Sequence, residues 1–323
     1  MNEFQVDEER IYQVLEPHRK KQNRYKGILL GYVCCMFLYP VVMGYLMPIL
    51  VNLNRVATNV IAFIIAIIGG LLNILALPAI IILAVLWTKA NREYKKKYKQ
   101  LIAENVLCSM FDDAQFYPDR GYTEAEFKGM HLIYWRNDFS YYSEDLITGS
   151  YKGVEFGRSD IRITHTSGSG KSRKTIVDVD GRLMEFAWRK EINSRILIVK
   201  KGERARLESG LNEIEMEDVE FNQKFDVYAE DAHSVFYLLT PRFMEYIKTL
   251  YDRDKMIYIS FDRRRLYFLQ SGHGGIFEPP EKGFNVHIET EKTRDELAEI
   301  GQIIELLQLD DMAEREKLLN VEI

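Results

Sequence analysis

The chain has 323 residues, of which 47% are hydrophobic and 28% are charged, and its formal net charge is −5. This composition excludes a disordered or collagen-like chain. The charges are divided unevenly, because residues 1–100 carry +7 and residues 101–323 carry −12. The first hundred residues therefore have a net charge opposite to that of the rest of the chain.

Two long apolar runs lie in the basic part of the chain. Residues 27–51 and 56–87 contain no Asp, Glu, Lys or Arg. Each run exceeds the roughly 20 residues with which a helix crosses about 30 Å of hydrocarbon. Basic residues flank the pair at His18–Lys26 and at Lys89–Lys99, whereas Arg55 alone lies between the runs. Because positive residues stay in the cytoplasm, we predict a multi-pass protein of the cell membrane with its N-terminus and C-terminal domain cytoplasmic.

The first run does not fit a cleaved signal peptide. It is too long for an h-region and is followed at once by a second run, so Met1 is expected to stay in the mature chain. Cys34 and Cys35 lie in the first run and Cys108 is expected in the cytosol. No disulfide framework and no thiolate metal site are therefore predicted.

The predicted fold class is α+β, with a two-helix transmembrane hairpin and a cytosolic domain of antiparallel sheet with packed helices. The helix of the second span is expected to continue beyond the membrane as a stalk, residues 88–108, because Tyr94, Tyr98 and Leu101 keep a helical spacing. The segments are a cytosolic N-terminal segment 1–26, transmembrane helix 27–51, an external loop 52–58, transmembrane helix 59–87, a juxtamembrane stalk 88–108, the α+β domain 109–309 and a C-terminal tail 310–323.

Within the domain, short runs rich in β-branched and aromatic residues between Gly, Asp and Ser predict strands. They are Ile133–Trp135, Asp145–Thr148, Val154–Phe156, Asp160–His165, Thr175–Val179, Arg182–Trp188, Arg195–Val199 and Phe225–Tyr228, with a hairpin formed by Met256–Phe261 and Arg265–Gln270 around Asp262–Arg264. Helices are predicted at Thr123–Leu132, with Thr123 as N-cap, after Thr240-Pro241, and from a capping box at Thr293 and Glu296.

The segment His165–Ser172 approaches the pattern of a phosphate-binding loop. That loop needs Gly at the position of His165, and a helix must follow it. The residues after Ser172 instead have a strand pattern. A Ser/Gly-rich hairpin loop is therefore favoured over a nucleotide site.

No other motif predicts a catalytic or metal site. Glu213, Glu215 and Glu217 alternate with apolar residues, which fits calcium ligands less well than an exposed, charged edge strand. The histidines lack ligand spacing, and neither Gly168-Ser169-Gly170 nor Cys108 has the setting of a nucleophile. We expect no catalytic residue, no metal and no cofactor, so the interpretation leans away from an enzyme.

Two basic clusters are candidate contact sites. Lys95, Lys96, Lys97 and Lys99, here called the lysine collar, are expected to contact lipid headgroups just below the second span. The collar would hold the stalk at the leaflet while the acidic domain stands away from it. Arg263, Arg264 and Arg265 are a possible anion contact, although at least one of three consecutive residues should face solvent.

Several segments resemble a family of bacterial membrane proteins known as domain-of-unknown-function family 3137. They are Phe221–Tyr246, Tyr94–Tyr98, Tyr142–Ser150, Ile257–Phe261 and Ile276–Pro279. The resemblance implies a two-span protein with a cytoplasmic C-terminal domain and supplies no catalytic residue. Ser271–Gly275 and the loop at 167–172 depart from the family pattern.

The sequence favours a membrane-anchored cytosolic binding or scaffold protein with an unknown ligand. The alternatives are an inner-leaflet enzyme acting on a lipid or envelope precursor, and an oligomeric transport accessory. Membrane lipid and a protein partner are expected to bind, the chain could form a homo-oligomer, and no nucleic acid partner is expected.

Overall fold

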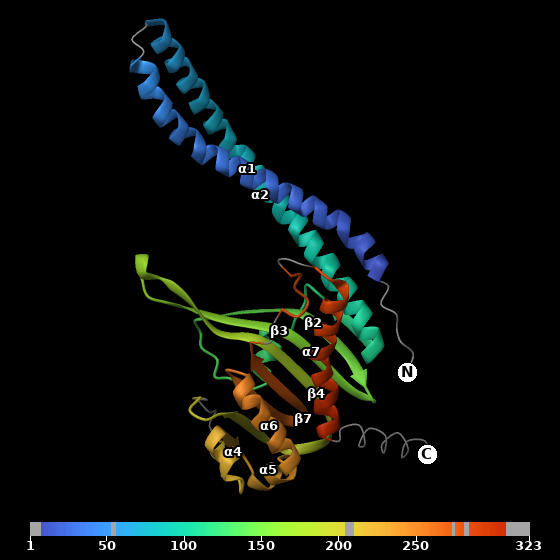
Figure 1. Cartoon of the computed structure of the whole chain (residues 1–323). Coiled ribbons are helices and arrows are strands. Elements are labelled where there is room, and N and C mark those ends of the chain that lie inside the picture. Colours follow the sequence, from blue (N-terminus) through green and yellow to red (C-terminus); the bar gives the residue numbers. More distant parts are fainter. Residues whose placement is uncertain (1–7, 53–55, 204–209, 273–274, 281–283, 308–323) are drawn as a thin grey trace. The chain divides into compact units, whose positions relative to one another are not determined.

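The computed structural model describes residues 8–52, 56–203, 210–272, 275–280 and 284–307 (Figure 1). The chain divides into two units, one formed by Asp7–Tyr98 and the other by Met1–Val6 together with Lys99–Ile323. We call the first the helical unit and the second the domain, and each is described by itself.

The helical unit consists of α1 (Glu8–Asn52) and the larger part of α2 (Val56–Met110). The two helices lie antiparallel, with Lys21 Nζ 3.0 Å from Glu93 Oε2. From the predicted N-terminal segment 1–26, α1 continues through Pro17 and the basic residues into the apolar run. Lys, Arg and Gln are good helix formers and extend the helix across that boundary. Of the predicted external loop, residues 53–55 lie outside the described residues.

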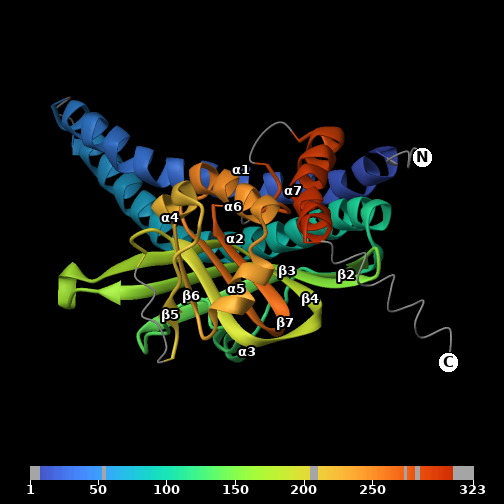
Figure 2. The same cartoon turned by 90° about the horizontal axis from the view of Figure 1, so that it is seen from below.

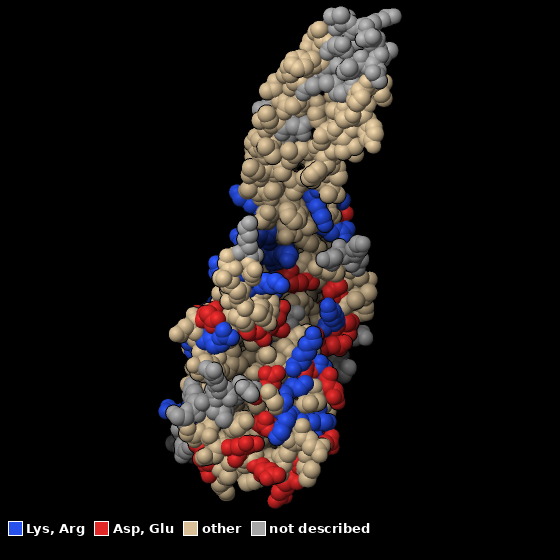
Figure 3. Space-filling model, turned by 90° about the vertical axis from the view of Figure 1, so that its left-hand side faces the viewer, with Lys and Arg blue, Asp and Glu red and all other residues tan. Residues whose placement is uncertain are grey.

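Many apolar side chains of the helical unit lie on its outside. Phe37, Tyr45, Phe63 and Ile74 are all more than 60% exposed, and Figure 3 shows an uncharged surface over this part of the unit. Among the described residues, one stretch, Glu8–Leu46, is long and apolar enough to cross a membrane. Many side chains between Val56 and Ala76 lie outside the description.

The domain is built on an antiparallel sheet, which confirms the predicted fold class at this level. Its strands are β1 (Asp112–Tyr117), β2 (Phe139–Tyr151), β3 (Val154–Ser167), β4 (Lys174–Lys200), β5 (Asn212–Glu213), β6 (Phe225–Ala229) and β7 (Ile257–Ser271). The described strands follow the order β1-β2-β3-β4-β6-β5, and β7 also pairs with β4. The central strand β4 thus touches three others.

The strands β4 and β7 are longer than the sequence suggested. Three predicted strands merge into β4, and the predicted hairpin around Asp262–Arg264 is wrong, because β7 runs through it without a turn. Arg263 has φ +51°, and the register with β4 shifts between Ala187 and Ile196. Such bulges bend a strand and increase its twist. Met256 and Ser271 are hydrogen-bonded through their backbones, so the two ends of β7 curl toward each other.

Helices cover both faces of this sheet. They are α3 (Glu124–Gly129), α4 (Val219–Lys224), α5 (Ala232–Leu238), α6 (Pro241–Arg253) and α7 (Val286–Leu306). The capping box of Thr123 and Glu126 starts α3, and Thr240 caps α6 as predicted. The predicted start of the last helix at Thr293 is wrong. Asn285 caps α7 eight residues earlier, and Thr293 is buried inside the helix.

The domain core lies on the two sides of the sheet. On one side Leu183, Leu197 and Leu269 pack with Phe127 of α3. On the other side Phe268 of β7 lies 6.3 Å from Phe243 of α6, measured between ring centroids. Figure 2 shows α3 on one side and α6 and α7 on the other. Each fully buried Phe contributes roughly 1.5–3 kcal/mol.

Two further predicted strands differ from the structure. Ile133–Trp135 is a loop between α3 and β2, and the acidic stretch forms only the two-residue strand β5. The predicted tail 310–323 lies outside the described residues.

Candidate functional site

A groove opens at the rim of the α3 side of the core. Its volume is about 690 Å³. The loop before β2, the start of β4 and the start of β7 line it, through Ile133, Tyr134, Trp135, Arg136, Asn137, Phe139, Asp178, Val179, Met256 and Tyr258. We call it the aromatic groove. Because its walls come from three separate parts of the chain, only the folded domain forms it.

The rings of the groove are fixed by their neighbours. Trp135 meets Phe139 edge to face at 5.5 Å and Phe127 at 6.1 Å between centroids. Nζ of Lys128 lies 4.6 Å from the centroid of the Trp135 ring, a distance at which a cation is attracted to the aromatic face. Trp135 and Phe139 also pack against the buried core. The groove therefore offers an aromatic surface that is held in place before any ligand arrives.

A polar pair lies at one end of the groove. Nδ1 of His165 on β3 is 2.6 Å from Oδ2 of Asp178 on β4, and the His165 ring lies 6.3 Å from that of Phe139. A half-buried carboxylate and imidazole beside aromatic rings can hydrogen-bond an amide, a hydroxyl or an amine. This chemistry suits a ligand that is partly apolar and partly polar.

The groove residues are not among the site residues predicted from the sequence. The spacing of the histidines does not indicate a site, and Trp135 falls in a predicted strand. The run from Ile133 to Tyr142, which has five aromatic residues among polar ones, was the signal available. Its meaning depends on contacts with β4 and β7 that are distant in sequence.

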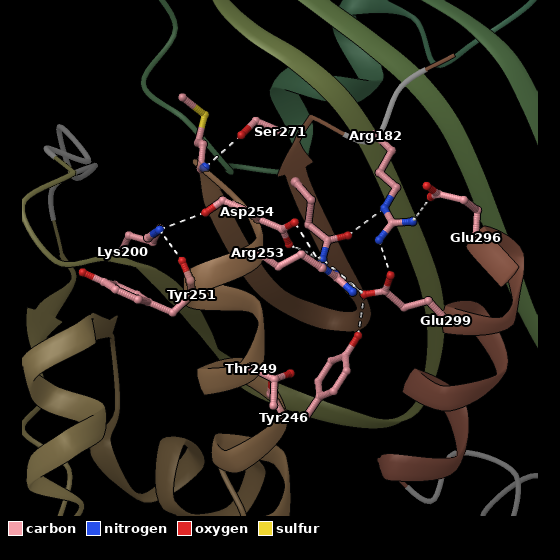
Figure 4. A network of polar contacts seen from close by, with 12 residues as sticks. Arg182, Lys200, Tyr246, Thr249, Tyr251, Arg253, Asp254, Ser271, Glu296 and Glu299 are labelled. Atoms are coloured by element: carbon pink, nitrogen blue, oxygen red, sulfur yellow. Dashed lines mark hydrogen bonds and ion pairs between the residues drawn. The ribbon is translucent and has the colours of Figure 1, made fainter. Parts of the chain in front are cut away.

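A buried polar network lies on the other side of the sheet, between β4, β7, α6 and α7 (Figure 4). Arg182 of β4 donates from Nε to Oε1 of Gln270 at 2.8 Å and forms ion pairs with Glu296 and Glu299 of α7. Glu299 also accepts from the hydroxyl of Tyr246 at 2.6 Å and from Nη2 of Arg253 at 2.7 Å. The network ties both helices to the sheet.

The charge balance of this network keeps Glu299 ionised. Burial alone would raise the pKa of Glu299, but the charge of Arg182 and the hydrogen bonds from Arg253 and Tyr246 outweigh it and lower the pKa to about 2. Burial and the neighbouring Glu299 carboxylate raise the pKa of Tyr246. The donors and acceptors named here satisfy one another, which is typical of a structural clamp.

A second buried cluster forms around Lys99. Its Nζ lies 2.7 Å from Oδ2 of Asp145, 3.0 Å from Oε1 of Glu278 and 3.6 Å from Oε2 of Glu144. Burial, opposed by Lys99 and assisted by the charges of Asp160 and Glu144, raises the pKa of Asp145 to about 7. The acidic partners of Lys99 outweigh the effect of its burial and raise the pKa of its ammonium group.

This geometry changes the interpretation of the lysine collar. The Lys99 side chain is 6% exposed and paired with acids of the domain, so lipid contact by Lys99 does not agree with the structure. The basic run did not indicate these ion pairs, because Asp145 and Glu278 are distant from Lys99 in sequence. Lys96 and Lys97 are exposed and Lys95 is half-buried, and their contact with lipid stays a prediction.

The three arginines of the predicted anion contact are consecutive residues of β7 and differ in their surroundings. Arg263 and Arg264 are exposed, whereas Nη1 of Arg265 lies 3.3 Å from Oε1 of Glu185 on β4. The structure thus divides the cluster, and anion contact by its members stays a prediction. Within the described residues, no group of three His, Cys, Asp or Glu side chains is placed to hold a metal ion.

The segment that approached a phosphate-binding loop closes a β-hairpin. Ser167 of β3 pairs with Lys174 of β4, and a single 3-10 turn, Gly170–Ser172, lies between them. A strand follows the loop where a phosphate-binding loop requires a helix.

A family model described as "Protein of unknown function (DUF3137)" matches residues 178–309. This part of the chain is similar to the DUF3137 family. The predicted resemblance is thereby confirmed, and the DUF3137 region includes most of β4, all of β7, α6 and α7 and the complete Arg182–Glu299 network. Of the aromatic groove, it supplies Asp178, Val179, Met256 and Tyr258.

No curated protein matches the chain significantly. Among solved structures, the chain is similar to the mycobacterial trehalose monomycolate transport factor A, TtfA, at 10% sequence identity and a TM-score of 0.30. The similarity covers 63% of this chain and 92% of that one. At this level it transfers neither a fold nor a function to this chain.

Proposed function

We propose that the chain is a membrane-anchored binding or scaffold protein whose cytosolic domain holds part of its partner in the aromatic groove. The observation that carries this proposal is the groove itself, in which fixed aromatic rings lie beside the His165–Asp178 pair. Concave sites with apolar walls and a few polar groups are where proteins usually bind ligands.

Membrane anchoring is supported by two features. The stretch Glu8–Leu46 is long and apolar enough to cross a bilayer, and the apolar run at 56–87 also has sufficient length. Basic residues at both flanks favour two spans with both ends in the cytoplasm. The proposal therefore keeps the multi-pass arrangement.

Binding is favoured over catalysis by the lining of the groove. An inner-leaflet enzyme would be expected to converge several carboxylates or histidines on one pocket. Among the described residues that line the aromatic groove, Asp178 is the one carboxylate. Its pairing with His165 fits orientation of a bound group.

The test places a photo-crosslinking amino acid, benzoylphenylalanine, in the full chain in its native membrane. One variant carries it at Tyr134, which lines the groove, and a matched control carries it at Tyr142, which is also an exposed tyrosine but lies outside the lining. We expect a discrete adduct from position 134 that is absent at position 142. Adding Trp135→Ala should remove the adduct, because it removes a wall of the groove. Equal adducts at both positions, or none at position 134, would contradict the proposal.

A further inference from the structure

The hairpin between β3 and β4 extends beyond the rest of the sheet (Figure 1). Pairing of β2 with β3 ends at Phe139 and His165, and pairing of β7 with β4 begins at Gly181. Between these limits, among the described strands, β3 and β4 pair only with each other. We call Thr166–Val177 the basic ribbon.

Nearly all of the basic ribbon is exposed. Every residue from Thr166 to Val177 is exposed, apart from Lys171, whose side chain lies outside the description. Gly168 and Gly170 have φ of +86° and +56°, which lets the chain reverse tightly at the tip. Since the ribbon packs on no core, substitutions in it leave the core contacts of the domain intact.

The charge of the basic ribbon is opposite to that of the surrounding domain. It contains Lys171, Arg173 and Lys174 and no Asp or Glu, whereas residues 101–323 together carry −12. Arg173 and Lys174 are exposed next to the tip. A local concentration of cations on an acidic protein attracts an anionic surface despite the overall charge.

Apolar side chains accompany these cations. Ile176 is 42% exposed and Val177 is 45% exposed. Cations beside exposed apolar side chains are typical of elements that lie in the interface of an anionic bilayer, where headgroups pair with the cations and the apolar atoms leave water.

We propose that the basic ribbon docks on the surface of an anionic lipid bilayer. Arg173 and Lys174 would contact the phosphate groups of the lipids, and Ile176 and Val177 would enter the interface. A bilayer is favoured over other polyanions, because a chain with a membrane-spanning helix meets lipid at a high effective concentration. The inference does not depend on what the aromatic groove binds.

The test uses the full chain reconstituted in nanodiscs of zwitterionic lipid, so that anionic lipid is present only in added vesicles. Flotation measures binding to phosphatidylcholine vesicles with and without phosphatidylglycerol. We expect the wild type to bind the anionic vesicles preferentially. The pair Arg173→Gln/Lys174→Gln should lower the partition coefficient on the order of 30-fold, since each basic residue contributes roughly 5-fold.

Two further variants separate the causes. Lys255→Gln/Lys292→Gln removes the same charge from exposed positions outside the ribbon and should lower binding far less. Ile176→Ser/Val177→Ser should weaken binding even at salt concentrations that screen surface charges.

Three results would overturn the inference. The first is equal binding of the wild type to zwitterionic and anionic vesicles. The second is wild-type binding by the arginine–lysine pair variant together with loss of binding by Lys95→Gln/Lys96→Gln/Lys97→Gln, which would assign the contact to the lysine collar. The third is displacement of the wild type from vesicles by a stoichiometric amount of a short oligonucleotide, which would indicate a nucleic acid site.

Discussion

Nζ of Lys99 lies 2.7 Å from Oδ2 of Asp145, with the lysine 6% exposed and the aspartate fully buried. Asp145 has φ +57° and lies where the register between β2 and β3 shifts. A buried bulge thus presents a carboxylate to the last turns of α2. The pair joins the helix that leaves the helical unit to the first long strand of the domain, so its contribution to stability can be measured.

Lys99→Met should lower the free energy of unfolding of the domain by about 3 kcal/mol, because Asp145 would stay buried without its cation. Thermal unfolding of the full chain in detergent, followed by near-ultraviolet circular dichroism, measures the loss. Adding Asp145→Asn should restore part of it, since Asn is neutral and tolerates a positive φ. Lys96→Met, at an exposed position, is the matched control, and an equal loss in both single variants would refute this role for the pair.

The stability of the domain should also depend on pH through Asp145. Its pKa is about 7 in the folded domain and near its ordinary 3.8 when unfolded. Between these values the folded state binds the extra proton, so the free energy of unfolding decreases as the pH rises from about 4 to about 7 and then levels off. Unfolding temperatures measured across this range should show a smaller slope for Asp145→Asn than for the wild type. Identical slopes would show that another group is responsible.

Glu299 should have the opposite effect in a more acidic range. Its folded pKa is about 2 against an ordinary 4.5, so its stabilisation is complete above about pH 4.5 and is lost as the pH falls through 2. The loss should be on the order of 3 kcal/mol. Acid unfolding of Glu299→Gln should lack this component, whereas Glu296→Gln, which removes only one contact of Arg182, should keep most of it. The prediction fails if both variants respond to acid alike.

The membrane arrangement can be tested with cysteine labelling. After Cys34, Cys35 and Cys108 are replaced by Ser, a single cysteine introduced at Asn54 should react with an impermeant maleimide in intact cells, because Arg55 is the one basic residue between the apolar runs. Cysteines added next to Met1 or Ile323 should react only after permeabilisation. Labelling of the C-terminal cysteine in intact cells would reverse the proposed topology.

Local sequence signals predicted several elements correctly. Thr240-Pro241 marks the start of α6, and Thr123, predicted as an N-cap, marks the start of α3, where it forms a capping box with Glu126. Both depend on hydrogen bonds between residues close in sequence, so a short window contains the necessary information. Thr293 and Glu296 show the limit of this argument. The same pattern lies inside α7, because Asn285 caps the helix earlier and Thr293 donates to the carbonyl of Glu289.

Long-range pairing explains the remaining differences. Asp262–Arg264 has the polarity of a turn, but β7 passes through it since β4 bulges at the matching position. The aromatic groove could not be predicted from local sequence either. Its lining residues Trp135, Asp178 and Tyr258 are distant in sequence and come together only in the folded domain. Lys99 was assigned to the lipid side because its carboxylate partners come from distant loops and strands.

The length of β4 determines where the protein can be divided. The family match begins at Asp178, which lies four residues inside this strand. Cutting the gene there would remove β3 and leave Gly181–Phe186 of β4 without its neighbour on one side. An uncovered strand edge recruits other chains, so the fragment 178–309 should aggregate, whereas cleavage in the connection between α1 and α2 would spare the sheet.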